Sequence, residues 1–205
     1  MKKFFALCLL GFVALGMAVG EQPEWITDLD VYVEQHYKPK EGQPEYMYYY
    51  VQNREFAKGR STAKRFAEDL FARHFMEVVY SSFDSVAAGT EQLAEISGGT
   101  IDVDDMQVLA GAYKKAFEGV TFSNYEFLKW YYEETYDEAG KKGYTCFVLG
   151  RVPKKAISDM LLTIEKKAED LAGNKLENVA DDTLADIMRK LRSATVDKIA
   201  EKINQ

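Results

Sequence analysis

Few side chains in this sequence are suited to nucleophilic or metal-dependent chemistry. The 205 residues include 2 Cys and 2 His, against 33 Asp and Glu. A structural zinc site takes about four Cys, His or carboxylate ligands, and a cysteine nucleophile works beside a histidine base. The sequence contains no G-x-S-x-G, H-E-x-x-H or glycine-rich nucleotide motif. We therefore expect no enzyme activity, no bound metal and no cofactor.

Cys146 and His74 are the two side chains that most invite a functional interpretation. Cys146 lies in an apolar, β-rich run, where a lone cysteine is expected to be a small buried hydrophobe; a nucleophile is the alternative. His74 falls on the predicted apolar stripe of a helix. We expect it to be half-buried beside a backbone partner, and a proton-responsive group is the alternative.

Asp102, Asp104 and Asp105 resemble part of a calcium-binding loop. They lack the central glycine and the terminal glutamate of such a loop, and a helical pattern follows them. Acidic residues are favourable at the positive end of a helix dipole. We therefore expect these three residues to begin a helix rather than to bind a metal.

The N-terminus has the three parts of a secretory signal peptide. Lys2 and Lys3 precede an apolar run of 12 residues, and Ala18-Val19-Gly20 supplies small residues for cleavage before Glu21. A membrane anchor is the alternative, but the uncharged run is only 17 residues long, and a spanning helix needs about 20. Cys8 lies inside the apolar run after Leu7 and fits a lipid-attachment site poorly. We expect export with cleavage after Gly20.

The net charge is −7, and it becomes −9 if residues 1–20 are removed with their two lysines. An acidic chain lacks the basic footprint of a general nucleic-acid binder, so no nucleic-acid partner is expected. A hydrophobic content of 47% and a charged content of 29% are typical of a chain with a folded core. Removal of Cys8 would leave Cys146 without an intramolecular disulfide partner.

Hydrophobic periodicity and turn residues divide the rest of the chain into strands and helices. The predicted elements are an initial segment at 21–44, a strand at 45–56, a helix at 61–82, one or two helical turns at 90–97, a helix at 106–117, a strand at 120–136, a strand at 144–152, a helix at 153–173 and a helical tail at 174–205. The polar turn at 137–143 makes the last two strands an antiparallel hairpin.

These elements predict an α+β fold, in which amphipathic helices cover an antiparallel β-sheet in the order β-α-α-β-β-α, with an extra C-terminal helix. The predicted divisions are a signal peptide (1–20), the initial segment (21–44), the α+β domain (45–173) and the tail (174–205). The tail is expected to pack on the domain through its apolar stripe. Presentation of the tail to a partner is the alternative.

The aromatic strand at 120–136 supplies the candidate partner-binding residues. Without a bulge, alternation places Leu128, Trp130 and Tyr132 on one face, and Phe127, Lys129 and Tyr131 on the other. Lys129 and the nearby acids Glu133 and Asp137 suggest that the second face is the more exposed to solvent. We therefore predict that Tyr131 and Phe127 contact a partner and that Trp130 belongs to the core. Equally, the initial segment around Trp25, or the tail, is able to cover that face.

Three segments resemble the bacterial lipoprotein-20-like family, which includes the N-terminal domain of the flagellar assembly protein T. They are Pro23-Glu24-Trp25-Ile26, the tyrosine-rich strand running through Gly59 into the helix at 61–82, and the run from Tyr144 to Lys154. The resemblance covers about residues 23–173. It implies helices covering an antiparallel sheet, a non-catalytic role in the cell envelope, and envelope proteins or flagellar-base components as partners. The lipid-bearing cysteine of the lipoprotein members has no credible counterpart, so membrane tethering stays uncertain.

The favoured function is an exported interaction or scaffold protein of the periplasm or outer membrane. The alternatives are a secreted hydrolase with an unrecognised carboxylate site, and a carrier of a small apolar ligand among the aromatic strands. A deep pocket with convergent carboxylates would favour the hydrolase, and a dry apolar cavity would favour the carrier. An exposed aromatic patch would favour the scaffold. The pathway and the oligomeric state do not follow from the sequence.

Overall fold

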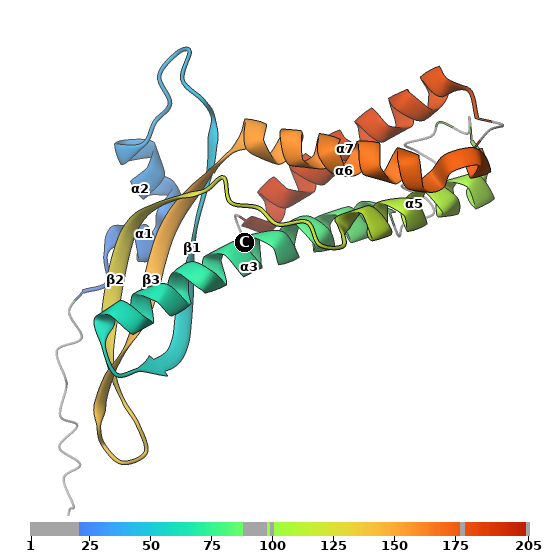
Figure 1. Cartoon of the computed structure of the whole chain (residues 1–205). Coiled ribbons are helices and arrows are strands. Elements are labelled where there is room, and N and C mark those ends of the chain that lie inside the picture. Colours follow the sequence, from blue (N-terminus) through green and yellow to red (C-terminus); the bar gives the residue numbers. More distant parts are fainter. Residues whose placement is uncertain (1–20, 88–97, 99–100, 177–178, 204–205) are drawn as a thin grey trace, which may run out of the picture.

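The computed structural model describes residues 21–87, 98, 101–176 and 179–203. The expected signal peptide and the helical turns expected at 90–97 lie outside these residues. A small antiparallel sheet lies at one end of the molecule, and long helices extend from it as an arm (Figure 1). The α+β fold class predicted from the sequence is therefore confirmed.

The sheet has three strands in the order β1-β3-β2, all antiparallel. β1 spans Tyr46–Ala57, β2 spans Glu126–Tyr136 and β3 spans Lys142–Pro153. The predicted hairpin of β2 and β3 is confirmed, and Asp137 closes its turn by accepting bonds from the backbone of Ala139 and Lys141. The strand expected from Val120 begins only at Glu126.

Helix α3, Arg60–Ala87, connects the sheet to the arm. Its 28 residues make it about 42 Å long. Its buried side includes Ala67, Phe71 and Phe75, whereas Leu70 is only partly buried. His74 is exposed, which corrects the prediction that it is half-buried on the apolar stripe. The buried face of α3 is turned relative to the predicted apolar stripe. The reason is that β1 and β3 cover the first half of α3, and α7 packs along the helix.

In the described part of the chain, the arm consists of α3 with three further helices: α5 (Val103–Phe117), α6 (Lys154–Ala172) and α7 (Asp181–Ile203). α5 packs mainly on α6, and α7 packs mainly on α3. Asp102 caps α5 by accepting a bond from the Asp105 amide at 2.8 Å, as expected of a helix-starting acid. Gly173, with φ +49°, ends α6, and a short 3₁₀ turn, Gly173–Leu176, leads toward α7.

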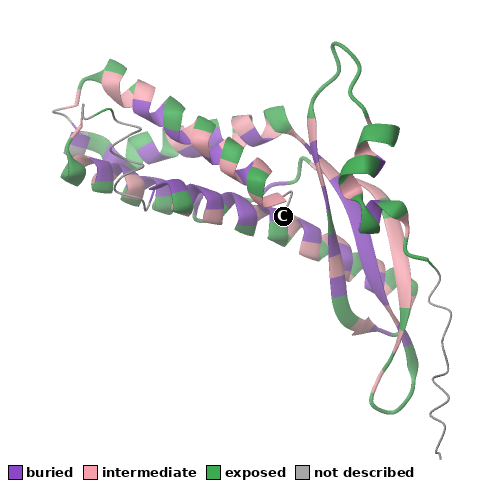
Figure 2. Cartoon of the chain, turned by 180° about the vertical axis from the view of Figure 1, so that it is seen from behind, coloured by how far each residue is buried: buried purple, intermediate pink, exposed green. Residues whose placement is uncertain are grey.

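The C-terminal tail packs on the domain, as its apolar stripe predicted. Ile187, Leu191 and Ile199 of α7 are each at most 2% exposed. The buried residues therefore run along the arm as well as across the sheet (Figure 2). Within the described residues, no helix is both long and apolar enough to cross a membrane.

The initial segment covers the other face of the sheet with two short helices, α1 (Glu24–Thr27) and α2 (Leu29–His36). Trp25, Ile26 and Tyr32 are buried there against Phe147 and Leu149 of β3. These five residues form a second, smaller core. Because helices cover both faces of the sheet, β3 is buried along most of its length (Figure 2).

Candidate interaction surface

A bulge in β2 changes which side chains share a face. Phe127 lies opposite Gly150, but Lys129 lies opposite Leu149, so Leu128 is an extra residue. Phe127 therefore lies on the α3 side with Trp130, in contact with the main core. Leu128 and Tyr131 contact the second core. The simple odd-even alternation expected for this strand is wrong at Phe127 and Leu128, because an inserted residue reverses the alternation.

The two predicted partner-binding residues consequently lie on opposite faces of the sheet. The centroid of the Phe127 ring lies 5.4 Å from that of Phe71 and 5.2 Å from that of Tyr125, so Phe127 packs against other residues of the same chain. Tyr131 is half-buried, and its ring lies 5.9 Å from that of Phe147. A single patch containing both residues is excluded. In the structure, the initial segment around Trp25 covers the face of the sheet that carries Tyr131. This is the alternative that was stated for this strand.

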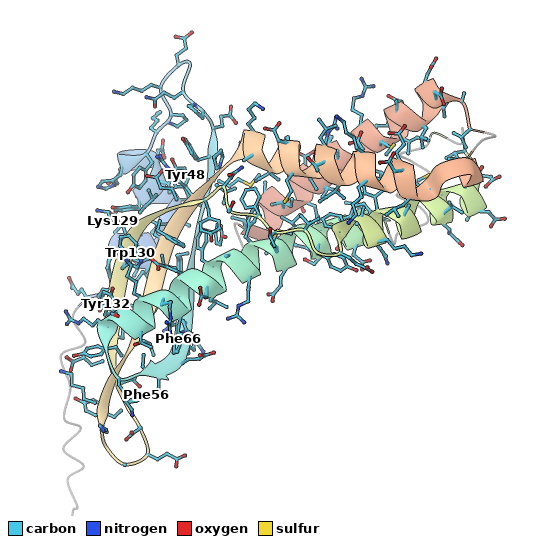
Figure 3. All side chains as sticks on the ribbon, in the orientation of Figure 1. Tyr48, Phe56, Phe66, Lys129, Trp130 and Tyr132 are labelled. Carbon is cyan, nitrogen blue, oxygen red and sulfur yellow. The ribbon has the colours of Figure 1, made fainter. Side chains whose placement is uncertain are left out.

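Trp130 was expected in the core, but it is only partly buried at the margin between β2 and α3. Its indole Nε1 donates to Glu68 at 3.1 Å, and Lys64 Nζ lies 4.0 Å from its ring centroid. Arg60 similarly lies 5.6 Å from the centroid of Tyr132. Figure 3 shows Trp130 and Tyr132 in succession along β2, beside the first turns of α3. The pairing of a cation with each ring explains why neither aromatic side chain is fully buried.

A second group of half-exposed aromatic rings lies on β1 and the segment before it. We define the tyrosine surface as Tyr37, Tyr46, Tyr48 and Arg151. The ring centroids of Tyr37 and Tyr48 lie 5.4 Å apart in a stacked arrangement, and those of Tyr46 and Tyr48 lie 6.2 Å apart. The Arg151 guanidinium lies 4.1 Å from the centroid of Tyr46 and donates to Glu126 through Nη2 at 2.6 Å. Stacking and ion pairing thus hold all four side chains in place.

The tyrosine surface surrounds a shallow depression of about 140 Å³. Pro39, Gln43, Pro44, Glu45 and Lys154 complete its lining. Burial, with a smaller contribution from neighbouring Tyr32, raises the pKa of Tyr37. From the sequence, Tyr46 and Tyr48 were expected to belong to the core and the sheet surface, with a small-ligand carrier site as the alternative. Alternation alone does not reveal that their rings stay partly open beside Pro39.

Cys146 behaves as the buried hydrophobe that its strand predicted. It is 0% exposed, and its thiol contacts the Phe147 carbonyl oxygen at 3.3 Å. Burial raises the pKa of the Cys146 thiol to about 12. A thiol with so little thiolate at neutral pH is a poor nucleophile. Exposed His74, by contrast, lines an open depression of about 460 Å³ between the initial segment and the end of α7.

A further depression with an apolar lining lies away from the aromatic strands, among which the carrier alternative would place its ligand. It is an open groove of about 320 Å³ between the end of α5, residues 120–124 and α6. Val120, Phe122 and Met160 line it, and Lys167 at its rim donates to the carbonyls of Ala116 and Glu118. Among residues 21–87, 98, 101–176 and 179–203, no three His, Cys, Asp or Glu side chains are grouped as a metal site.

Comparisons of the chain with protein-family models, with curated proteins and with solved structures found no match. The resemblance to the lipoprotein-20-like family therefore rests on the sequence segments alone and stays a prediction.

Proposed function

We propose that this chain is an exported, non-catalytic interaction or scaffold protein of the cell envelope, acting in the periplasm or at the outer membrane. The observation that carries the proposal is the tyrosine surface. Tyrosine and arginine are enriched at protein interfaces, where a large ring supplies contact area and a hydroxyl or guanidinium supplies hydrogen bonds. Envelope proteins or flagellar-base components are the partners that the sequence resemblance suggests.

The tyrosine surface suits binding because it is already ordered. Tyr37 and Tyr48 are stacked, and Glu126 fixes Arg151 under Tyr46. A partner that docks on these rings therefore loses little binding energy to side-chain ordering. The depression between the rings and Pro39 offers space for one protruding side chain of the partner.

Export is supported by the charged start, the short apolar run and the small residues at Ala18 and Gly20. We expect the intact mass of protein recovered from the envelope fraction to correspond to a chain that begins at Glu21. A chain that retains Met1, or one with a lipid on Cys8, would contradict this part of the proposal.

Site-specific photo-crosslinking tests the interaction itself. A photoreactive phenylalanine analogue at Tyr48 should crosslink to an envelope protein in living cells, and the same analogue at exposed Lys166 on α6 provides the control. Tyr46→Ala should then reduce the yield from position 48, with little change in melting temperature. Equal crosslinking at positions 48 and 166, or none at either, would refute the tyrosine surface as the binding site.

A further inference from the structure

β2 is the open edge of the sheet. The strand order β1-β3-β2 leaves both outer strands with one unpaired side. At β1, α7 contacts the strand, and α2, β1 and α7 together line one depression through Leu29, Met47 and Ala200. No strand of the described chain pairs with the outer side of β2. Its 11 residues contain no proline, so alternate N–H and C=O groups are free to pair with another strand.

We propose that a second copy of this chain pairs with this edge. β2 of each copy would run antiparallel to β2 of the other, with the two-fold axis perpendicular to the sheet at Tyr131. The two three-stranded sheets would then form one continuous sheet of six strands, with α3 of both copies on the same face. A two-fold interface must be self-complementary, so each residue pair occurs twice.

The charges along β2 are self-complementary in this register. Lys129 of each copy lies opposite Glu133 of the other, and both side chains belong to the α1 side of the sheet. Lys129 shares that side with its strand neighbour Leu149, and Glu133 accepts a bond there from Gln22 at 2.8 Å. Lys129 has no ion pair with any described residue. Opposite charges directly across a pair of strands stabilise it.

The aromatic residues match in the same register. Trp130 of each copy lies opposite Tyr132 of the other, on the α3 side of the sheet. Cross-strand aromatic pairs stabilise antiparallel strands. The ring pair also brings Glu68, which accepts the Trp130 indole bond, toward Arg60 of the other copy, which lies beside Tyr132. Figure 3 shows Lys129, Trp130 and Tyr132 along this edge.

Other registers lose this match. Moving the two-fold axis by one residue removes the opposition of Lys129 and Glu133. Moving the axis by two residues places either Lys129 or Glu133 opposite itself, and like charges directly across two strands are destabilising. The charge pattern therefore selects the axis at Tyr131. The pairing does not depend on the tyrosine surface, so the two proposals are tested separately.

A charge-swap experiment tests the proposed pair. The full chain and the variants Lys129→Glu, Glu133→Lys and Lys129→Glu/Glu133→Lys are compared by sedimentation velocity over a wide range of concentration. Each single reversal should weaken dimerisation about tenfold or more, because the two-fold axis repeats the lost contact, and the double reversal should restore it to within about threefold. Lys166→Glu and Glu169→Lys on α6 are matched controls and should leave the dimer unchanged.

Hydrogen exchange of the unmodified protein supplies a measurement that needs no variant. Backbone amides of residues 129–133 that point away from β3 should become protected as protein concentration rises. A protein that is monomeric throughout, or a dimer that is indifferent to both single reversals, would overturn the proposal. Single reversals that weaken dimerisation without rescue in the double variant would overturn the proposed register.

Discussion

Phe71 is the side chain that joins α3 to the sheet. Its ring stacks on that of Tyr49 at 4.0 Å, and the Tyr49 hydroxyl donates to the Phe71 carbonyl at 3.1 Å. The ring also fills the space above Gly150, where a Cβ would come within 2.5 Å of it. Glycine at position 150 thus allows the close approach of the helix and β3.

We predict that Phe71→Ala destabilises the protein by about 3–5 kcal/mol, because a fully buried ring is lost and a cavity remains. Leu70→Ala should cost less, since Leu70 is only partly buried. Arg65→Ala, at an exposed position, should cost well below about 1 kcal/mol. Urea unfolding measures all three changes, and equal losses for Phe71 and Arg65 would show that the helix orientation is wrong.

Cys146 should be chemically silent in the folded protein. With a thiol pKa of about 12, the folded protein should resist iodoacetamide at pH 8 and react fully in urea. The unfolded thiol loses its proton near pH 8.5, whereas the folded thiol keeps it up to about pH 12. The unfolded state thus binds fewer protons in this window, so the free energy of unfolding should fall as pH rises.

Cys146→Ala is the control for this prediction. It should remove the part of the alkaline slope that belongs to the thiol and leave the contribution of buried tyrosines such as Tyr49, whose pKa burial also raises. Rapid alkylation of the native protein at pH 8 would mean that the strand opens to solvent.

At the level of elements, the initial segment is a structural part of the sheet rather than a linker. Trp25 is 4% exposed and lies in the second core with Phe147 and Leu149. The ring centroids of Trp25 and Tyr50 lie 6.1 Å apart in an edge-to-face arrangement. Without α1 and α2, the apolar side chains on this face of β3 would be open to water.

Trp25→Ala should therefore destabilise the fold by about 3–5 kcal/mol, as expected for loss of a buried tryptophan. Val31→Ala in α2, where the side chain is 40% exposed, is the matched control and should change stability by less than about 0.5 kcal/mol. Urea unfolding and binding of a hydrophobic dye measure the two effects. A Trp25 variant as stable as the Val31 variant would show that the segment detaches in solution.

Local signals predicted the elements that local chemistry determines. The hairpin followed from the turn at 137–143, the start of α5 from its acids, and the end of α6 from Gly173. The bulge at Leu128 was not predictable, because it depends on how β2 pairs with β3. The cover around Trp25 and the rotation of the α3 stripe depend on contacts far apart in the sequence. For the same reason, the sequence did not reveal that Phe127 and Tyr131 lie on opposite faces of the sheet.

At the level of the whole molecule, α3 is shared by the sheet and the arm. Among the described residues, the arm consists of two pairs of helices, α3 with α7 and α5 with α6. An ion pair joins these helix pairs: Arg192 of α7 donates to Glu165 of α6 at 2.6 Å. The two side chains are 25% and 13% exposed. Burial raises the pKa of Glu165, and Arg192 opposes that shift. The hydroxyl of Tyr113, also in the arm, is buried without a hydrogen-bond partner among the described residues.

We predict that Arg192→Ala destabilises the protein at pH 7 by about 1–3 kcal/mol, because it leaves a mostly buried carboxylate without its partner. Loss of Arg192 should raise the pKa of Glu165 further above its unfolded value. The folded state then binds more protons than the unfolded state as pH falls, so the loss of stability should shrink toward pH 5. Glu165→Leu/Arg192→Met, which removes both charges, should be nearly neutral. Urea unfolding at the two pH values measures these changes, and a loss that is independent of pH would mean that Arg192 acts through packing rather than through Glu165.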